Sequence, residues 1–462
     1  MQAPASRLGG RLIESLSHYR PRFVYPHSCA RAGRVTLHSR PAACLNETAA
    51  RTHLRQEPDA LAPIRPTIAQ IIPNLDSGGA EVTTLEVTEA IVQAGGRALV
   101  LSEGGRLAKN IVAAGGETLM FPAATKNPAR IIWNAQALKR IIVRERVDLI
   151  HARSRAPAWS ALVAARGVEL PIVTTYHGAY KEVGRLKNLY NGVMARADIV
   201  IANSEYTAHS IRARYGKPES GIAVINRGVN FERFDPARVP AERVAALRER
   251  WGIEPSQRIV LYAARLSPLK GQFVVIEAAR LLKESGRLGD TVIALAGSDQ
   301  GRTAYTEQLT AQIGAADLGA SVRLVGHLDD MPGGLSAADV ALVVSVEPEG
   351  FGRVAAEAQA MGCPVIVTHI GALPEAVRAV PRVAEADITG WTVPPGDTGA
   401  LAEAMARALA LPDAERQAMG RRARAYVMAN FSAWHMQRLT LAVYDRLLGT
   451  TLEAQFKART PA

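Results

Sequence analysis

Short apolar runs alternate with helical patterns along most of the chain. From Pro66 onward, each run is followed by a longer segment whose apolar residues recur every three or four positions, as on one face of a helix. This alternation is typical of a parallel α/β sheet, because parallel strands are joined by crossover helices. The strands predicted in the first half are Ile68–Ile72, Ala98–Leu101, Asp148–Ile150, Ile172–Thr175, Ile199–Ala202 and Ala223–Ile225. The helices predicted there are Glu81–Gln93, Arg130–Arg144 and Pro157–Arg166.

A second series of the same kind follows Asn226–Pro240, a segment with little apolar periodicity that we interpret as a linker. Its predicted strands are Ile259–Ala263, Val292–Ala296, Val322–Val325, Val340–Val344 and Pro364–Val367. Its predicted helices are Gln272–Glu284, Tyr305–Ile313, Ala355–Met361 and Leu401–Ala410, with a last helix at Trp434–Leu448. The pattern predicts two doubly wound domains that face each other across a cleft, with ligands at the carboxyl ends of the strands.

The length also favours two domains. The chain has 462 residues, and a single hydrophobic core stops growing at roughly 250–300. We expect a first domain at residues 66–235, a second at 236–430 and a C-terminal helix at 431–449 that packs back on the first domain. Residues 1–65 differ in composition, since positions 1–62 hold nine arginines, no lysine and four acidic residues without a sustained apolar period. We predict that this leader is disordered.

The overall charge narrows the classes of partner. A net charge of +12 and a pI near 9.8 indicate attraction to anions, which include nucleic acids, acidic membranes and phosphorylated substrates. No apolar run approaches the roughly 18–20 residues that a membrane-spanning helix needs. The three cysteines are too few and too scattered for a disulfide framework or a zinc site. A cytoplasmic location fits best.

Two carboxylates flank a glycine-rich turn in the second half. Glu349 and Glu357 are separated by eight positions, which is just over two helical turns. The residues that begin the turn between them are Gly350, Phe351, Gly352 and Arg353. Glycines let a backbone approach a ligand closely, and the helix that follows directs free N–H groups toward it. The spacing suggests an elongated ligand such as a sugar nucleotide, although a glycosidase with paired carboxylates stays open at this point.

Further candidates follow predicted strands. Arg265 and Lys270 come after Ile259–Ala263 and have the charge to bind a diphosphate, bidentately for Arg and as a point charge for Lys. His177 follows Ile172–Thr175. Gly78 and Gly79 precede a predicted helix, where backbone N–H groups favour an anion or an acceptor group.

The order of these motifs resembles the family 4 retaining glycosyltransferases, which have the GT-B fold of two Rossmann-like domains. The matching motifs are Ser77-Gly78-Gly79-Ala80-Glu81, Tyr176-His177-Gly178, Asn226-Arg227-Gly228-Val229-Asn230, Ala264-Arg265-Leu266, Lys270-Gly271, Glu349-Gly350-Phe351-Gly352, Glu357, Gly362-Cys363-Pro364-Val365 and Gly371-Ala372-Leu373-Pro374-Glu375. One departure is Arg227, where the family usually runs from Asn directly into Gly. The segment Tyr176–Ala208 and the Glu349 loop further look like bacterial enzymes that build the lipopolysaccharide core.

The resemblance implies roles for the candidates. Glu357 would accept hydrogen bonds from the ribose of the nucleotide, and Glu349 would lie beside the donor sugar. His177 would contact the transferring sugar, while Arg265 and Lys270 would bind the diphosphate. The Gly350, Phe351, Gly352 and Arg353 loop would hold sugar hydroxyls or the distal phosphate.

The expected function is a retaining, metal-independent transfer of a hexose from a nucleotide diphosphate sugar to a cell-envelope glycan or glycolipid. No metal cofactor is expected, because Asp329 and Asp330 are adjacent rather than spaced as Asp-x-Asp, and Arg265 and Lys270 could supply the positive charge. Nucleic acid is not an expected partner. The alternatives are a sugar-nucleotide epimerase of the same fold and a non-catalytic binding module for nucleotide sugars.

Two basic segments suggest a membrane-surface partner. Arg130–Arg146 and Tyr180–Arg196 combine arginines and lysines with apolar residues, as helices that lie on anionic lipid do. For Arg130–Arg146 an ordinary crossover helix that buries one face on the sheet is an equal alternative. The hypothesis is peripheral binding to the inner face of the cytoplasmic membrane.

Overall fold

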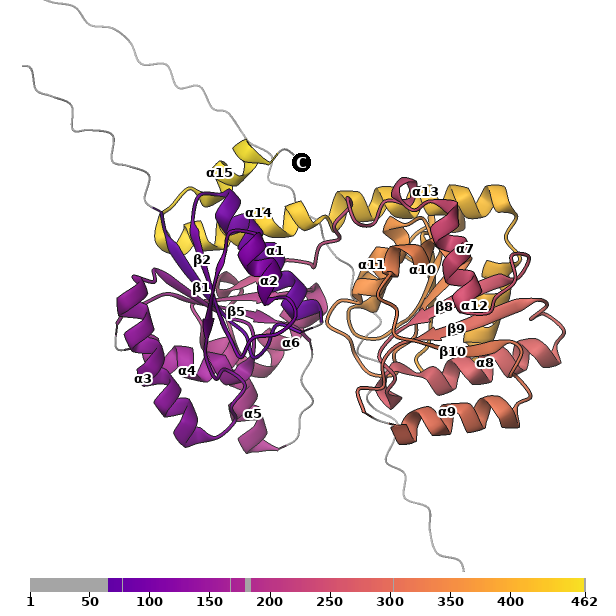
Figure 1. Ribbon diagram of the computed structural model, residues 1–462, viewed down its shortest axis with the longest axis horizontal. Helices are drawn as coiled ribbons and strands as arrows, with labels where there is room; N and C mark the ends of the chain where they lie inside the picture. Colours follow the sequence, from indigo (N-terminus) through magenta and orange to yellow (C-terminus); the bar gives the residue numbers. More distant parts are fainter. Residues whose placement is uncertain (1–64, 77, 167, 179–183, 302, 461–462) are drawn as a thin grey trace, which may run out of the picture. The chain divides into compact units, whose positions relative to one another are not determined.

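The computed structural model describes residues 65–76, 78–166, 168–178, 184–301 and 303–460. The predicted leader, Ser77 and the segment 179–183 with Lys181 therefore lie outside the described residues. The remainder forms two parallel sheets in one compact unit that begins at Ala62. Helices flank both sheets (Figure 1), as the sequence pattern predicted.

The first sheet contains seven strands in the order β3-β2-β1-β4-β5-β6-β7, and every paired neighbour is parallel. Its strands are β1 Thr67–Ile71, β2 Arg97–Ser102, β3 Glu117–Met120, β4 Leu149–Ala152, β5 Ile172–Tyr176, β6 Ile199–Ala202 and β7 Ile222–Val224. Its helices are α1 Gly79–Gln93, α2 Ala108–Ala113, α3 Pro128–Glu145, α4 Arg155–Ala165, α5 Arg185–Asn191 and α6 Glu205–Tyr215. The order reverses between β1 and β4, which is where a doubly wound sheet binds its ligand.

The second sheet has six parallel strands in the order β10-β9-β8-β11-β12-β13. They are β8 Arg258–Ala263, β9 Thr291–Ala296, β10 Val322–Gly326, β11 Val340–Val343, β12 Val365–Thr368 and β13 Gly390–Val393. The helices of this half are α7 Ala241–Arg250, α8 Gln272–Glu284, α9 Thr303–Ala315, α10 Met331–Ala337, α11 Arg353–Ala360, α12 Thr398–Leu409 and α13 Asp413–Asn430. The switch point of this sheet lies between β8 and β11.

Each sheet is buried on both faces, which explains why its central strands appear in the sequence as continuous apolar runs. On β1, Ile68 packs with Val87 and Ile91 of α1, whereas Ile71 packs on the opposite side with Leu138 of α3. Successive side chains of a strand point to opposite faces, so a single run supplies both cores.

The sequence pattern missed β3 and β13, and both are edge strands. β3 is largely exposed and contains Glu117, so it has no apolar run to detect. β13 begins with Gly390, whose Cβ position is filled by the carbonyl of Val365 on the neighbouring strand. Helices with few apolar residues were missed for the same reason, among them α2, α6 and α7, whereas α5 lies within the predicted basic segment Tyr180–Arg196.

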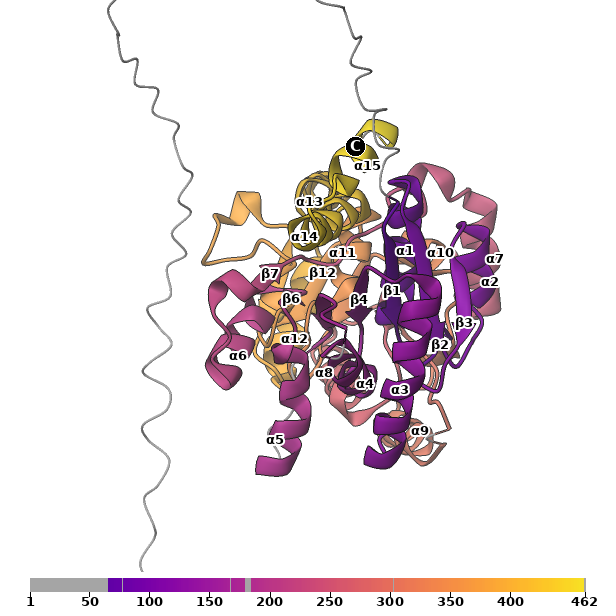
Figure 2. The same cartoon turned by 90° about the vertical axis from the view of Figure 1, so that its left-hand side faces the viewer.

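The predicted linker Asn226–Pro240 contains no α-helix or named strand. Val229 and Phe234 anchor it, because both side chains are buried and Val229 forms a β-bridge with Ser432. After this bridge the chain continues into α14 Ala433–Leu448 and α15 Leu452–Arg459. These two helices lie beside α1 in both views (Figures 1 and 2), and Tyr444 of α14 shares a core with Val87 and Ile91.

Two glycines let α13 approach the end of α11. An ideal Cβ on Gly420 would lie 2.3 Å from the carbonyl oxygen of Gly362. We expect Gly420→Ala to lower the free energy of unfolding by about 1–3 kcal/mol through overpacking. The matched control is Gly314→Ala in α9, where no atom lies within 4 Å of the new methyl group. That variant should gain up to about 0.5 kcal/mol from helix propensity. Urea denaturation measures the free energy of unfolding of both variants. Equal changes in the two variants would contradict the packing argument.

Candidate active site

Glu349 and Lys270 form an ion pair beyond the carboxyl ends of the neighbouring strands β11 and β8. Lys270 Nζ lies 2.5 Å from Glu349 Oε1, and the two side chains are 24% and 20% exposed. The hydroxyl group of Ser345 donates to the same carboxylate oxygen. Both predicted residues thus meet at one point of the sheet edge, where they stay within reach of solvent.

A buried tyrosine holds the backbone under this pair. The Tyr262 hydroxyl donates to the carbonyl oxygen of Lys270. Burial raises the pKa of Tyr262 well above its usual value, and the charge of Glu349 adds to the shift. The hydroxyl therefore stays protonated and keeps donating at any physiological pH.

Arg265 follows the same strand as Lys270 but lies in a different environment. Its side chain is exposed, with Nη1 3.4 Å from Gln300 Oε1. Its carbonyl oxygen accepts a hydrogen bond of 3.0 Å from the Gln272 side chain, which fixes the turn after β8. Of the two predicted diphosphate ligands, Lys270 is thus engaged by a carboxylate, while the guanidinium group of Arg265 extends from the surface.

Gly350 brings the two halves of the site together. An ideal Cβ on Gly350 would lie 2.7 Å from the Cα of Gly178 and 2.8 Å from the carbonyl oxygen of His177. Only a residue without a side chain fits between these backbone atoms. Glu349 and His177, which the sequence places in separate halves, therefore lie on segments that touch.

The rest of the glycine-rich loop contributes backbone rather than side chains. Phe351 is 2% exposed and packs edge-on against Phe431, with ring centroids 5.4 Å apart. Gly352 has a φ of +80° and is the N-cap of α11. Phe351 is therefore a core residue whose side chain cannot meet a ligand on the loop, and the predicted contacts of this loop are left to its N–H groups.

Arg353 joins the two halves through a buried ion-pair network. Its Nε lies 2.8 Å from Glu357 Oε1, one helical turn further along α11, and its Nη2 lies 2.9 Å from Glu86 Oε1 on α1. Both carboxylate side chains are 9% exposed and the Arg353 side chain is 18% exposed. Glu86 Oε2 and Arg353 Nη1 are buried without a hydrogen-bond partner among the described residues.

The network shifts the acid–base properties of its members. Burial raises the pKa of Glu357, and the neighbouring charge of Arg353 acts in the opposite direction. Burial alone would lower the pKa of Arg353, but Glu86 and Glu357 outweigh it and hold that pKa above its usual value. The predicted ribose-binding carboxylate is thus oriented by a permanently charged guanidinium group.

His177 lies at the end of β5 and contacts a buried arginine. Arg227 Nη2 is 2.7 Å from His177 Nδ1. Burial lowers the pKa of His177 well below its usual value, and the charges of Arg227 and Arg153 add to this effect. A hydrogen bond to the Arg153 backbone acts in the opposite direction but does not outweigh them, so the imidazole is neutral at physiological pH.

Gly78 and Gly79 begin α1 beside this histidine. Gly78 is the N-cap of α1, with a φ of 153°. A Cβ on Gly79 would lie 2.8 Å from Arg227 Nη1, and Arg227 donates to the Gly79 carbonyl oxygen. Gly79 thus makes room for a buried guanidinium group, a reason for glycine that the motif alone did not reveal.

Three residues of this region have contacts that the sequence pattern did not predict. Glu86 resembled a surface residue of an amphipathic helix, yet α1 buries a polar face that includes Thr83, Thr84 and Thr88. Arg227 stood out only as a departure from the family pattern. Glu375 accepts hydrogen bonds from the backbone N–H groups of Glu205 (2.9 Å) and Tyr206 (2.7 Å), at the start of α6.

The adjacent aspartates serve local structure. Asp330 caps α10 by accepting from Gly333 N at 3.0 Å, and it pairs with Arg243 Nε at 2.6 Å. Asp329 lies 3.3 Å from His327 Nε2. In the described part of the chain, no group of three or more His, Cys, Asp or Glu side chains could hold a metal ion.

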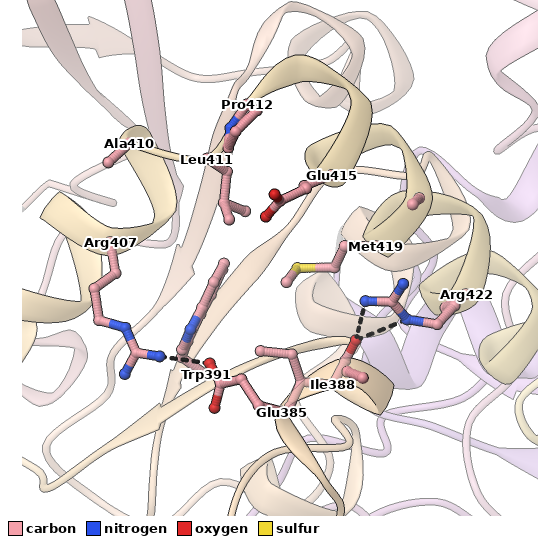
Figure 3. Close-up of a pocket in the computed structure, with 12 residues that line it drawn as sticks. Glu385, Ile388, Trp391, Arg407, Ala410, Leu411, Pro412, Glu415, Met419 and Arg422 are labelled. Carbon is pink, nitrogen blue, oxygen red and sulfur yellow. Dashed lines mark hydrogen bonds and ion pairs between the residues drawn. The ribbon is translucent and has the colours of Figure 1, made fainter.

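A separate pocket of about 630 Å³ lies among β13, α12 and α13 (Figure 3). Trp391 and Met419 contribute to its apolar lining, and an ion pair between Arg407 and Glu385 borders it. None of the predicted site residues lines this pocket, so it belongs to another face of the second half.

Comparisons with known proteins agree with this geometry. Residues 77–233 match Glycosyltransferase Family 4, and residues 244–426 match Glycosyl transferases group 1. The crystal structure of a glycosyltransferase from Rickettsia africae ESF-5 is 30% identical, with a TM-score of 0.75, and covers 84% of this chain and 100% of that one. The structure of HepE from Anabaena in complex with UDP and glucose shares the fold at 20% identity and a TM-score of 0.68, covering 82% of this chain and 99% of that one.

Curated relatives match over a shorter length. The D-inositol 3-phosphate glycosyltransferase of Streptomyces bingchenggensis is 34% identical over 253 residues, which are 50% of this chain and 53% of that protein. The chain thus spans about half the length of the curated relatives that it matches.

Two parallel doubly wound sheets, with acidic and basic side chains gathered at their carboxyl ends, define a GT-B protein. The chain belongs to the family 4 glycosyltransferases.

The Arg353 network predicts that a variant without this arginine loses stability to an extent that depends on pH. Arg353→Gln should lower the free energy of unfolding by about 3–5 kcal/mol, because it leaves two buried carboxylates without their cation. Without Arg353, burial raises the pKa of Glu357 with only the weaker charge of Arg233 opposing it, so the folded pKa lies further above the unfolded one. Folding then favours the protonated acid, and stability falls as the pH rises through the folded value.

Urea denaturation of wild type and variant at about pH 5.5 and about pH 8 tests this expectation, with the larger loss due at the higher pH. The double variant Arg353→Gln/Glu357→Gln should recover part of the stability at high pH. A loss that is independent of pH would contradict the electrostatic explanation.

Proposed function

We propose that this chain is a retaining, metal-independent hexosyltransferase that uses a nucleotide diphosphate sugar and a glycan or glycolipid acceptor of the cell envelope. The observation that carries the proposal is the arrangement of Lys270, Glu349 and Glu357 along the carboxyl edge of the second sheet. That edge is where doubly wound sheets bind nucleotides.

The proposed donor orientation follows from charge. The Glu357 carboxylate has the two acceptor oxygens that a ribose diol needs, and Arg353 fixes its direction. Lys270 and Arg265 carry the positive charge that a diphosphate leaving group requires. The N–H groups from Gly350 onward would meet the sugar or the distal phosphate, since they open α11 and point away from it.

In this proposal Glu349 stabilises and positions, and it is not a nucleophile. Its carboxylate is engaged by Lys270 and Ser345, which suits an electrostatic role. The leaving diphosphate would accept the proton of the acceptor hydroxyl on the same face of the sugar, which retains the anomeric configuration. Arg265 and Lys270 replace the charge of a divalent ion.

The proposed glycolipid acceptor is inferred from the exposed surface of helix α3. Its inner face, with Ile131, Leu138 and Ile142, is buried on the first sheet, as in an ordinary crossover helix. Its outer face is unusual, because Ile132, Trp133 and Val143 are 59%, 64% and 65% exposed. The basic residues of the helix that accompany them are Arg130, Lys139, Arg140 and Arg144.

An aromatic and aliphatic surface with interspersed cations fits the interface of an anionic bilayer. The proposed association is peripheral. No helix in the described residues has the length and apolarity to cross a membrane. The association would bring the enzyme to a glycolipid acceptor.

A second acceptor class is favoured by the names of the curated relatives, which identify an inositol phosphate acceptor. A soluble phosphorylated polyol would not require the exposed α3 surface. Incubation with one radiolabelled donor and either membrane extract or inositol phosphates separates the two, since label enters the organic phase only with a glycolipid.

Donor binding is the first test. Thermal-shift measurements with GDP-mannose, UDP-glucose, UDP-galactose and UDP-GlcNAc should show stabilisation by one donor, and chelator should leave it unchanged. Glu357→Gln should weaken binding of that donor about tenfold, which corresponds to the loss of one hydrogen bond to a charged group. If none of the four donors stabilised the wild type, the proposed donor class would lose its support.

Turnover distinguishes the role of Glu349. Glu349→Gln should lower kcat by about 10²–10³ while donor affinity changes little, because the lost interaction is strongest in the transition state. Glu415→Gln on the exposed surface of α13 is the control and should keep wild-type turnover. A Glu349→Gln variant with full activity would exclude the proposed arrangement.

Vesicle sedimentation tests the α3 surface. The wild type should sediment with anionic vesicles at low salt and be released as salt screens the attraction. Trp133→Ser and Arg140→Gln should each weaken binding, whereas Met428→Ser, which removes a 49% exposed side chain on α13, should not. Equal binding to neutral vesicles would contradict the electrostatic part of the proposal.

A further inference from the structure

The Lys270 ammonium group has two tasks in the proposed site, and the two conflict. It pairs with Glu349 Oε1 at 2.5 Å, and it is also a proposed ligand of the donor diphosphate. A diphosphate carries more negative charge than one carboxylate, so an arriving donor would attract the ammonium group away from Glu349. A carboxylate held by this partner alone would then be free to rotate.

Ser345 supplies a second donor to the same carboxylate oxygen. Its hydroxyl group donates to Glu349 Oε1, the atom that Lys270 contacts. A serine hydroxyl group has one proton, and a carboxylate accepts it more strongly than a phenol does. Although Ser345 also contacts the Tyr262 hydroxyl group, its proton therefore belongs to Glu349. Both donors meet at Oε1, and Oε2 has no hydrogen-bond partner in the described part of the chain.

Buried contacts hold Ser345 in place. The residue lies just after β11 and is 1% exposed. Thr368 Oγ1 at the end of β12 donates to the Ser345 carbonyl oxygen at 2.7 Å, and the next residue, Val346, donates from its N–H group to the Leu269 carbonyl oxygen at 3.1 Å. The Lys270 side chain, in contrast, is 24% exposed and ends a flexible four-carbon stem. Ser345 is thus the fixed donor and Lys270 the movable one.

We propose that Ser345 is a positioning residue for the transfer reaction, because it holds Glu349 Oε1 while the donor diphosphate occupies Lys270, so that the carboxylate keeps its orientation during turnover. This inference rests on the proposed function and deepens it, since it separates the two partners of one carboxylate by the stage at which each is needed. It also explains why a buried hydroxyl group follows the wholly apolar strand β11.

Crystal structures of two variants test the positions directly and need no substrate. Lys270→Met removes the ammonium group and so reproduces its departure from Glu349. In this variant the Glu349 carboxylate should stay within hydrogen-bond distance of the Ser345 hydroxyl group. In Lys270→Met/Ser345→Ala the carboxylate should leave that position. A carboxylate that turns away from Ser345 in the single variant, or that keeps its place in the double variant, would overturn the proposal.

Turnover measures the consequence for the reaction. The readout is release of nucleoside diphosphate from whichever of GDP-mannose, UDP-glucose, UDP-galactose and UDP-GlcNAc stabilises the wild type, with membrane extract or inositol phosphates as acceptor. Ser345→Ala should lower kcat about tenfold, as expected for one lost hydrogen bond to a charged group, while the KM for the donor changes less than about twofold.

The matched control is Ser160→Ala in α4. Ser160 is also 1% exposed, but its hydroxyl group donates to the Ile131 carbonyl oxygen at 3.4 Å, outside the proposed site. This variant loses the same buried group and should keep wild-type turnover. An equal fall of kcat in the two variants would contradict the positioning role.

A double-variant cycle separates positioning from a general loss of structure. If Ser345 acts through the Glu349 carboxylate alone, its replacement has no further effect once that carboxylate is gone. The residual kcat of Glu349→Ala and of Glu349→Ala/Ser345→Ala should therefore agree within about twofold. A further fall of about tenfold in the double variant would mean that Ser345 supports another group, and the inference would be wrong.

Failure of the inference and failure of the proposed function have different signatures. If the wild type bound none of the four donors although Lys270→Met kept the carboxylate on Ser345, the proposed function would fail and the positional assignment would stand. If transfer occurred and Ser345→Ala kept the wild-type kcat, the function would stand and the inference would fail.

Discussion

A cation held between two buried carboxylates connects the parts of this molecule. Arg353 begins α11, faces Glu357 on its own helix and reaches Glu86 on α1 of the other sheet. None of the three charges could stay in this environment alone, because an unpaired buried charge costs several kcal/mol. The network thus fixes the direction of the proposed ribose-binding carboxylate and, in the same contacts, the position of α1. It explains why α1 buries a carboxylate, Glu86, although the helix packs against a sheet.

Arg353 is one of three arginines in this region, and their total charge exceeds that of their partners. Arg153 is 1% exposed and donates to Gln70 rather than to a carboxylate, and burial lowers its pKa to about 10. Arg227 likewise has neutral partners. Against the two carboxylates of the network, the three guanidinium groups leave one excess positive charge, which creates a positive potential that suits an anionic substrate. In the proposed reaction these arginines would add to the positive charge of Lys270 and Arg265.

The sequence was sufficient for the central strands of both sheets and for the place of three candidate residues relative to them. The central strands of both sheets are continuous apolar runs, and Glu349, Lys270 and Glu357 follow or flank them as predicted. The sequence could not show which residues contact each other when they lie far apart in the chain. Glu86 resembles a solvent-facing helix residue until Arg353, far away in the chain, is placed against it. Phe351 looked like part of a ligand loop because its neighbours are glycines, whereas its ring fills the core against Phe431. Edge strands such as β3 lack an apolar run because only part of their surface is covered.

The Glu375 carboxylate at the start of α6 has a consequence for how such enzymes can be recombined. The first N–H groups of a helix need acceptors, and here a residue from the other half of the chain supplies them. A chimera that joined the first half of this protein to the second half of a relative would keep the linker. It would, however, replace the carboxylate that accepts these hydrogen bonds. Such a hybrid would succeed only if the incoming half carried a carboxylate at this place, together with a basic residue for Glu86. The two halves are therefore a matched pair, and specificity cannot be exchanged by replacing one of them freely.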